Sequence, residues 1–481
     1  MRVADRLKLS LSQQADVYYT SLLMHAGCTA GSPQFAAYLA SDELVAQRDL
    51  CLCDPYNFRE VMGCLWSHAS PGSSVSSRGM HFLALLMQGE KAFAEVEHGC
   101  SDVGSTIAGR LRLPEATRQS LFQICDTWGG KGPHKLRRDD IPLPTRIVNA
   151  AMVFEVFFST TGQEAAIQAA TKRREKSFDP QVVDALRSLS ADDPLWQDLK
   201  HDDLWGLALS LEPEPRRYIG DRDLDDVASS LADFVDLKNS RVATHSRNVA
   251  CLAEGMARRV RLPEPDVVLT RRAALVHALG QIAVPAHVLN KEGPLTTDEN
   301  EKLRLHPYYT ERITARSPAL QAMGRIGAMH HERLDGSGYP QGLSGDQVPM
   351  TARIVALADA FQELTEDRPG KPAQSTDDAQ QQLERESGTK FDPVCLAALS
   401  QETGGSPARA PTRVQWPGGL TDREVEVLRL VSRGLTSKEM AKALVVSEST
   451  ARHHLEHIYA KAGVTSRAGA VMFAAENGLL L

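Results

Sequence analysis

HHERLDGSGYP, residues 330–340, places two adjacent histidines immediately before a glycine-rich turn that carries an acid. Neighbouring side chains point in different directions on a helix, so His330 and His331 reach one site only near a helix end or a turn. Neutral imidazole is a common ligand of iron, manganese and zinc. The pattern therefore indicates a metal site beside the turn, and the alternative interpretation is a histidine-rich turn on the surface.

This stretch resembles the HHExxDGxGYP signature of HD-GYP domains, which are metal-dependent phosphodiesterases that hydrolyse cyclic di-GMP. The resemblance covers about residues 236–400 and includes LNKEGPLTTDE, where Thr296 and Glu299 have the spacing of a helix capping box. It implies a metal site built from His245, His277, His306, His330, His331 and Asp359. It also implies a ligand loop beside that site, formed by Asp335, Gly336, Gly338, Tyr339 and Pro340.

The region departs from the family at the HD dipeptide, which is His277-Ala278 here, and at the lysine that follows, which is Gln281. Two dications held close together need a bridging carboxylate or hydroxide that offsets their repulsion. Without the aspartate, two sets of three ligands remain, and each set can hold one divalent iron, manganese or zinc ion. The sets are His245, His277 and Asp359, and His306, His330 and His331. We therefore expect metal binding without efficient cyclic-dinucleotide hydrolysis, and no catalytic residue is assigned.

The totals of the chain set the wider limits. Its 481 residues suffice for about three domains. The formal net charge of −7 does not by itself indicate a nucleic-acid partner. The eight cysteines show no CxxC pair, which favours reduced thiols over a zinc site. The N-terminus lacks the apolar core of a signal peptide, and no apolar run is long enough to cross a membrane. We expect a cytoplasmic protein without a membrane partner.

An internal repeat relates residues 1–190 to the HD-GYP-like region. The segment Arg146–Val148 matches Arg353–Val355, and the segment Phe178–Pro180 matches Phe391–Pro393. His25 occupies the position that His277 has in the second copy. Two homologous helical modules are the simplest account, with residues 191–235 as a helical connector between them.

The first copy has lost the metal ligands. Ile124 and Cys125 stand in the place of the histidine pair, and Met152 stands in the place of the aspartate. His25 and His98 alone cannot form a metal site, because such sites normally have three or more protein ligands. Residues 1–190 are therefore expected to form a packing or dimerisation module, and a metal-free ligand pocket is the alternative.

A linker rich in glycine and proline covers residues 401–418, and residues 419–481 resemble the LuxR-type helix-turn-helix domain almost end to end. Thr421 and Glu424 are spaced as a capping box, and Ser447 precedes a helix with one apolar stripe. In this motif the second helix enters the major groove of double-stranded DNA. The resemblance implies base contacts from Thr450, Arg452, His453 and His454, and phosphate contacts from Lys438, Ser447 and Lys461. The alternative is a four-helix interaction module with ordinary charged faces.

Together these features predict a mostly α protein with two HD-superfamily-like helical modules and a C-terminal four-helix LuxR-type domain. The leading hypothesis is a transcription regulator whose HD-GYP-like module senses a nucleotide, another small-molecule effector or a metal, or mediates dimerisation. Residues 420–481 contain eight Lys/Arg and seven Asp/Glu, so we expect a homodimer, which doubles the phosphate contacts. The alternative is a metal-dependent cyclic-dinucleotide phosphodiesterase with an appended DNA-binding domain.

Overall fold

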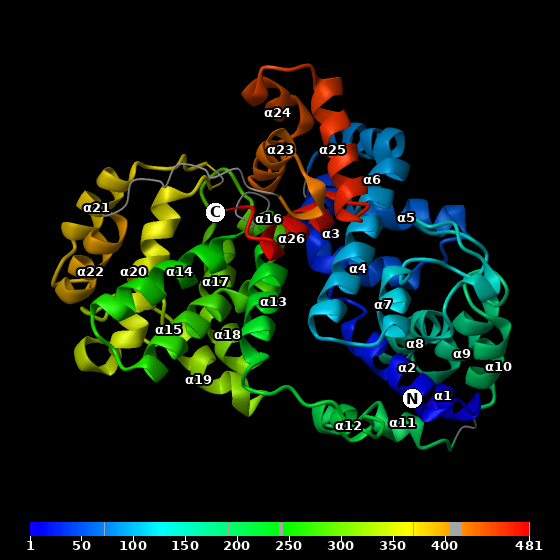
Figure 1. Ribbon diagram of the computed structural model, residues 1–481. Helices are drawn as coiled ribbons and strands as arrows, with labels where there is room; N and C mark the ends of the chain where they lie inside the picture. Colours follow the sequence, from blue (N-terminus) through cyan, green and yellow to red (C-terminus); the bar gives the residue numbers. More distant parts are fainter. Residues whose placement is uncertain (72, 190–191, 240–243, 369, 405–415, 481) are drawn as a thin grey trace. The chain divides into compact units, whose positions relative to one another are not determined.

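The chain is helical throughout the part that the structure describes (Figure 1). In this computed structural model the described residues are 1–481 without 72, 190–191, 240–243, 369, 405–415 and 481. Within those residues there is no β-strand, and only isolated β-bridges occur. The predicted mostly α class is therefore confirmed. None of the described helices combines the length and apolar character that a bilayer span requires.

The chain divides into two compact units, Met1–Ile219 and Gly220–Leu481. The boundary falls inside the predicted connector, residues 191–235, whose last helix packs with the second unit. The helices of the first unit are α1(Arg2–Arg6), α2(Leu11–Leu23), α3(Cys28–Leu39), α4(Glu43–Leu52), α5(Phe58–His68), α6(Val75–Arg110), α7(Glu115–Phe122), α8(Leu143–Thr161), α9(Gln163–Lys172), α10(Pro180–Arg187), α11(Leu195–Asp198) and α12(Leu204–Ser210). A short 3-10 helix, Arg138–Asp140, precedes α8.

Two local expectations for the first unit were wrong. The residue pattern predicts a loop-rich stretch over residues 50–79, but Asn57 caps α5 within it, and the prolines at 55 and 71 lie outside that helix. The pattern also predicts separate helices over residues 80–97 and 105–113, which are parts of one helix, α6. Packing of α6 against α3 explains the continuity, because tertiary contacts outweigh the low helix propensity of its glycines.

The structure repeats the same local geometry in both units, as the internal repeat predicts. In the first unit Arg146 forms an ion pair with Asp179 at 2.7 Å, and in the second Arg353 forms one with Asp392 at 2.8 Å. Each aspartate also caps the helix that begins at the following proline. An equivalent β-bridge precedes each cap, ending at Phe178 in one unit and at Phe391 in the other. The two units therefore match in these side-chain contacts as well as in sequence.

The second unit contains the HD-GYP-like region and the C-terminal module. Its first helices are α13(Leu224–Asp236), α14(His245–Arg259), α15(Glu264–Val276), α16(Ala286–Leu289), α17(Thr297–Arg304), α18(His306–Thr314), α19(Pro318–Gly327), α20(Met350–Thr365), α21(Thr376–Glu384) and α22(Pro393–Thr403). Short 3-10 helices cover Leu279–Ala283 and Gly345–Gln347. Val249 and Met256 of α14 and Leu357 of α20 lie in one buried cluster. This cluster fixes α14, α15 and α20, which carry the site described below.

The C-terminal module consists of α23(Asp422–Ser432), α24(Ser437–Leu444), α25(Glu448–Ala462) and α26(Arg467–Glu476), preceded by a 3-10 turn at Pro417–Gly419. The predicted capping box of Thr421 and Glu424 is present at the start of α23, and Ser447 caps α25. Ala451, Leu455 and Ile458 bury one stripe of α25 in the module's core. The predicted linker, residues 401–418, lies mostly outside the described residues, so its structure is not assigned.

Candidate metal centre and nucleic-acid interface

Helix ends bring the six candidate ligands of the HD-GYP-like region together. His245 is the first residue of α14, His277 caps the C-terminus of α15, and His306 begins α18. The histidine pair of residues 330–331 follows α19 directly, which is the helix-end placement that its spacing predicts. Asp359 comes from the buried face of α20. The structure thus gathers all six into two groups of three, each compact enough to hold one ion.

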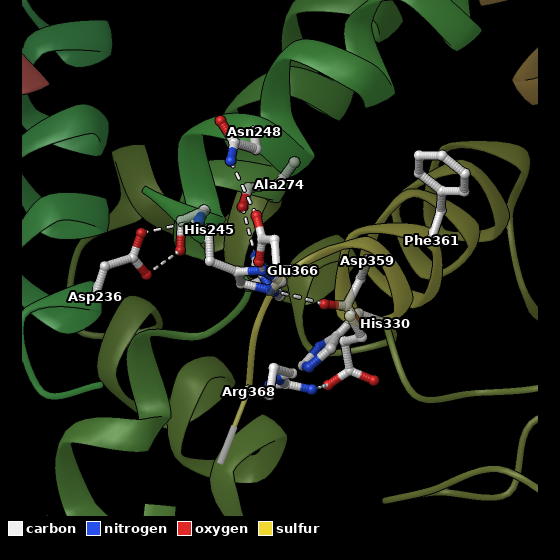
Figure 2. Close-up of polar contacts among 12 residues, drawn as sticks. Asp236, His245, Asn248, Ala274, His330, Asp359, Phe361, Glu366 and Arg368 are labelled. Carbon is white, nitrogen blue, oxygen red and sulfur yellow. Dashed lines mark hydrogen bonds and ion pairs between the residues drawn. The ribbon is translucent and has the colours of Figure 1, made fainter. Parts of the chain in front are cut away.

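The first group joins two imidazoles to one carboxylate (Figure 2). The Oδ1 atom of Asp359 lies 3.1 Å from Nε2 of His245 and 3.3 Å from Nε2 of His277. The Nδ1 atom of His277 faces the carbonyl oxygen of Ala274 at 2.6 Å. A carbonyl can only accept, so this Nδ1 carries a proton, and Nε2 is the ring nitrogen that faces Asp359 and the group.

The second group consists of three imidazoles. Nδ1 of His306 donates to the Leu303 carbonyl at 2.7 Å, and Nδ1 of His330 donates to the Gly327 carbonyl at 2.7 Å. Their Nε2 atoms lie 2.9 Å apart, and in these tautomers both present lone pairs. Two lone pairs at this distance repel each other unless a cation lies between or beside them. The donor arrangement therefore fits a metal ion.

The pKa shifts at the site favour the neutral, ligating form of the second group. Burial lowers the pKa of His306 to about 4, and burial lowers the pKa of His330 and His331 well below the usual value. At neutral pH these three imidazoles hold no second proton that a metal would have to displace.

Charge is distributed differently in the first group. Burial opposes the positive form of His245, but Glu366 and Asp359 on its two sides raise its pKa well above the usual value. Burial would raise the pKa of Asp359, yet hydrogen bonds from His245 and His277 hold it well below its usual range. A dication bound at Nε2 of His245 would replace the proton there, so metal binding at this group should release a proton.

One buried atom supports a metal at the first group. Oδ2 of Asp359 is buried and has no hydrogen-bond partner among the described residues. An unpaired buried carboxylate oxygen is costly, and coordination to a cation would satisfy it. The residues present therefore fit a divalent metal, held by His245, His277 and Asp359 at one group and by His306, His330 and His331 at the other. Such an ion would supply a positive charge for a phosphate oxygen.

Glu366 is a site residue that the sequence analysis missed. Its Oε2 accepts a hydrogen bond from Nδ1 of His245 at 2.7 Å, and its Oε1 accepts one from Nδ2 of Asn248 at 2.9 Å (Figure 2). Glu366 lies seven residues after Asp359, which places it two helical turns further along the same face. That spacing is the signal that could have found it. The contact orients His245, as acidic partners of metal-bound histidines do.

The alanine that replaces the family's aspartate lies inside this site. Ala278 is buried, directly after His277, and offers no ligand atom. Gln281 is half-buried in the following 3-10 helix and carries no charge. The two changes remove one carboxylate and one cation from the centre. A half-buried arginine, Arg368, pairs with Glu363 beside the site and is a second residue that the sequence analysis missed.

The ligand loop is fixed against the histidine pair. Tyr339 stacks on His331 with ring centroids 4.6 Å apart, and the Arg304 guanidinium lies 4.3 Å from the Tyr339 ring centroid. Glu332 accepts hydrogen bonds from two backbone amides of the loop, at 2.8 and 2.9 Å. A Cβ at Gly338 would lie 2.4 Å from the carbonyl oxygen of His331, so only glycine fits there. Tyr339 of the loop and Arg304 of α17 together present an aromatic face and a cation next to the candidate metal ligands.

The remaining loop candidates have local roles. The Asp335 carboxylate accepts from the Ser337 amide at 2.9 Å and so closes its own turn. Gly336 adopts φ +76°, a conformation that favours glycine. Asp335 and Pro340 are exposed, and neither contacts a metal-ligand candidate in the contacts that the structure gives.

The candidate DNA-contact residues cluster at and around the N-terminal half of α25. Ser447, Thr450, Arg452 and His453 are exposed, as is Lys438 on α24, while His454 is half-buried. The Ser447 hydroxyl accepts a hydrogen bond from the Thr450 amide and so caps α25. Arg452 forms an i,i+4 ion pair with Glu448 at 2.9 Å. An exposed pair of this kind is weak enough for a phosphate or a base to replace it.

Lys461 is placed differently from its expected role. Its Nζ lies 2.7 Å from Oε2 of Glu424, the carboxylate that completes the capping box of α23. The ion pair joins the end of α25 to the start of α23. The ion pair stabilises the module, while Lys461 itself is exposed, so its expected phosphate contact stays a prediction.

The first unit shows no equivalent metal group. Among the described residues, the compact groups of metal-type ligands are the two in the second unit. Ile124 is buried, and Cys125 follows it at the end of α7 in the position of the histidine pair. That residues 1–190 form a module without a metal site stays a prediction.

Comparison with known proteins covers both parts of the chain. Residues 229–395 match the HD domain, and residues 419–474 match the luxR family of bacterial regulatory proteins. The 3'3'-cGAMP-specific phosphodiesterase 3 of Vibrio cholerae is 30% identical over 403 residues, which cover 83% of this chain and 87% of that protein. A crystal structure of the cyclic GMP-AMP specific phosphodiesterase V-cGAP3 of V. cholerae superposes with a TM-score of 0.50 at 25% identity, covering 82% of this chain and 98% of that one.

A further relative matches the HD region alone. The cyclic di-GMP phosphodiesterase response regulator RpfG of Xanthomonas campestris is 38% identical over 173 residues, 36% of this chain and 46% of that protein. The long match to the V. cholerae protein spans both HD-related units, and the luxR match accounts for the C-terminal module. The chain therefore belongs to the HD-domain family of that V. cholerae phosphodiesterase, in a form that also carries a C-terminal LuxR-type DNA-binding domain.

Proposed function

We propose that this chain is a transcription regulator whose second HD module senses a cyclic dinucleotide and whose C-terminal module binds double-stranded DNA. One observation carries the proposal: six metal-ligand candidates are gathered in two groups beside a buried alanine, Ala278, where the family has an aspartate. This combination keeps the means to bind a phosphate and removes a part of the means to cleave it.

Three features support a cyclic dinucleotide as the ligand. The relatives named above act on 3'3'-cGAMP or cyclic di-GMP. The two ligand groups would hold cations that attract phosphate oxygens. Tyr339, with Arg304 over its ring, presents an aromatic face and a positive charge at the same place, which suits a nucleobase and its phosphate.

Two losses disfavour rapid hydrolysis. Without a carboxylate at position 278, Asp359 is the single carboxylate among the six ligand candidates, and it must offset the charge of any two dications alone. Without a lysine at position 281, one cation that could stabilise the developing charge on phosphate is missing. Each loss raises the barrier to attack by water more than it weakens binding of the ground state.

The output of the protein then passes to DNA. We assign base contacts to Thr450, Arg452, His453 and His454, and phosphate contacts to Lys438 and Ser447. A homodimer would double these contacts, which compensates for the small excess of basic residues in the module. As a DNA-binding regulator of transcription, the protein would act in the cytoplasm.

The test measures DNA binding with and without ligand. Purified full-length protein loaded with manganese or zinc should shift a fragment of its own promoter region at low salt, and added 3'3'-cGAMP or cyclic di-GMP should change the apparent Kd. The R452A variant should lose about 1–3 kcal/mol of DNA binding free energy. The R385A variant, which removes the exposed arginine that caps the C-terminus of α21, serves as the matched control. A lack of any shift at low salt would refute the DNA-binding role.

A second candidate function is a metal-dependent cyclic-dinucleotide phosphodiesterase with DNA binding as targeting. The unpaired Oδ2 atom of Asp359 favours it, because a site that keeps all six ligands still has an oxygen available to bridge two ions. Multiple turnovers of a cyclic dinucleotide, abolished by H330A, would establish this function in place of ligand sensing.

A further inference from the structure

The first unit contains a chain of thiols at the position of its lost metal site. Cys28 begins α3, Cys100 lies in α6, and Cys125 follows α7. The side chains of Cys28, Cys100 and Cys125 lie within interaction range in a row, Cys28 beside Cys100 and Cys100 beside Cys125. These three residues, with His25, are called the thiol cluster below.

The backbone holds α3 and α6 in close contact at this point. A Cβ at Gly27, the residue before Cys28, would lie 1.8 Å from the carbonyl oxygen of Cys100 and 2.7 Å from its Cα. The second unit shows the same approach, where a Cβ at Gly280 would lie 1.9 Å from the carbonyl oxygen of His306. Cys100 therefore occupies the place that His306 has in the second unit, and this register differs by one residue from the match of His25 with His277 expected from the sequence. The first unit thus has a thiol at the position where the second unit has His306, a candidate metal ligand.

The arrangement of the cluster favours a reaction between two thiols over a metal site. Metal ions need three or more ligand atoms around one point, and the thiol cluster is not among the compact ligand groups that the described residues form. Cys100 instead lies between Cys28 and Cys125, and its sulfur contacts each of these two thiols separately. Such pairwise contacts suit a disulfide, which joins two sulfurs.

The surroundings of Cys28 make it the reactive member. Nδ1 of His25 lies 3.7 Å from the Cys28 sulfur, and the His25 ring is exposed while Cys28 is half-buried, so small molecules can reach this end of the cluster. The hydrogen bond from Cys100 lowers the pKa of Cys28 to about 5, assisted by the hydrogen bond and charge of His25 and opposed by burial. Cys100 is buried, and its contacts with Cys125 and Cys28 raise its pKa well above the usual value.

One further thiol faces Cys28. Cys51, on α4, is half-buried, and its pKa is raised by burial and then by negative charge on Cys28. Cys51 is therefore a protonated thiol and the alternative to Cys100 as the disulfide partner of Cys28. Cys100 has the direct hydrogen bond to Cys28, so it is the nearer partner.

We propose that Cys28 and Cys100 are a peroxide-sensitive pair that forms a disulfide between α3 and α6, with Cys28 as the attacking thiolate and Cys100 as the resolving thiol. The Cys28 sulfur attacks one oxygen of a hydroperoxide, the O–O bond breaks, and the leaving oxygen takes a proton to become water or an alcohol. The sulfur is then a sulfenic acid. The Cys100 sulfur attacks it, the S–O bond breaks, and the departing hydroxide takes the Cys100 proton. Two thiols lose two electrons, and the hydroperoxide gains them.

The experiment treats reduced full-length protein with hydrogen peroxide, blocks the remaining thiols with N-ethylmaleimide, and identifies linked peptides by mass spectrometry. We expect a disulfide between Cys28 and Cys100 that dithiothreitol reverses. C28S should abolish it. C100S should leave Cys28 as a sulfenic acid that dimedone traps, because serine can still donate a hydrogen bond to the thiolate. C125S should still form the disulfide.

A second pair of contacting thiols, Cys53 and Cys64, provides the internal control. Burial, followed by the contact with Cys53, raises the pKa of Cys64 to about 12, so Cys64 is not an activated thiolate. At pH 5.5, Cys28 should be alkylated by iodoacetamide about ten-fold faster than an ordinary thiol, after allowance for the lower nucleophilicity of a low-pKa thiolate. H25A should move the midpoint of the Cys28 alkylation profile upward from about pH 5 while the disulfide still forms at pH 8.

Four results would overturn the proposal. They are oxidation of Cys53 and Cys64 before Cys28, a link from Cys28 to Cys51, a link from Cys100 to Cys125 with Cys28 left reduced, and protection of the cluster by one bound zinc ion in the purified protein. The last result would replace the redox pair by a metal site.

Discussion

Replacing Glu366 by glutamine should weaken one metal site about ten- to one-hundred-fold and leave the other unchanged. Glu366 accepts one hydrogen bond from Nδ1 of His245 and one from Asn248, at 2.7 and 2.9 Å. A glutamine has one accepting oxygen and one donating nitrogen at its end. If the oxygen faces His245, the nitrogen faces the donor of Asn248, and if it is turned, the nitrogen faces the histidine N–H. Either orientation loses one hydrogen bond and the negative charge.

The size of the effect follows from that loss. A hydrogen bond to a charged group contributes about 1.5–3 kcal/mol. Loss of an outer partner of a metal-bound histidine commonly costs ten- to one-hundred-fold in metal affinity, which is about 1.4–2.7 kcal/mol. The two estimates agree. The group of His306, His330 and His331 has its own partners, the carbonyls of Leu303 and Gly327 for two of its rings, and these contacts do not involve Glu366.

The assay is a titration of chelator-stripped full-length protein with zinc or manganese, followed by calorimetry and elemental analysis. The matched control is E363Q, which removes a carboxylate of the same helix whose partner is Arg368 and not a histidine. Equal affinity of wild type and E366Q at every bound equivalent, with unchanged helical content, would refute the assignment of Glu366. A loss of both sites together would also refute it, because it would show a general disturbance of the fold.

Three further predictions follow from single contacts. G338A should lower the metal content and the thermal midpoint, because its Cβ would meet the His331 carbonyl at 2.4 Å, whereas G293A, with nothing within 4 Å, should behave as wild type; a stable, fully loaded G338A protein would contradict the close approach. A278D should increase cyclic-dinucleotide turnover at least about ten-fold if the missing carboxylate limits catalysis, and unchanged turnover with normal folding would place the limit elsewhere. Burial opposes ionisation of Glu424, but hydrogen bonds from Lys461 and Thr421 hold its pKa below the usual value. The ionised carboxylate therefore stabilises α23 above about pH 4.3, and this stabilisation is lost as the pH falls through the folded pKa. The hydrogen-exchange protection factors of residues 422–432 should therefore fall at acid pH in wild type and depend less on pH in E424Q; equal pH dependence of the protection factors would contradict the ion pair.

Much of the metal site could be predicted from sequence because its ligands sit in spaced motifs. A histidine pair before a turn requires a helix end, and the structure places the pair directly after α19. The capping boxes that begin at Thr296 and Thr421 were predictable for the same reason, since the cap and its partner are three residues apart. Such features depend on local spacing, which a sequence displays directly.

The missed features depend on contacts between distant segments. Glu366 matters because it meets His245, which is far from it in the sequence, and no motif marks the pair. The thiols of Cys28 and Cys100 looked scattered because α3 and α6 bring them together across a long stretch of chain. The continuity of α6 was also hidden, because its glycines signal breaks unless the packing against α3 is known. Local propensity is a weak guide wherever tertiary packing decides.

The two units retain different parts of the site that the resemblance implies. The second unit has exchanged one carboxylate for alanine at position 278 and keeps its six other candidates together. The first unit has gone further and holds a thiol, Cys100, at the place of His306, yet it preserves the ion pair of Arg146 and Asp179 that the second unit also uses. The scaffold contacts are thus retained where the ligands are not. A module that must only bind needs the positive charge of a metal but not a water molecule activated between two metals. We therefore expect signalling to be most sensitive to substitutions at Tyr339 and Arg304, which would lower ligand affinity. Substitutions of residues that would position a nucleophile should matter less.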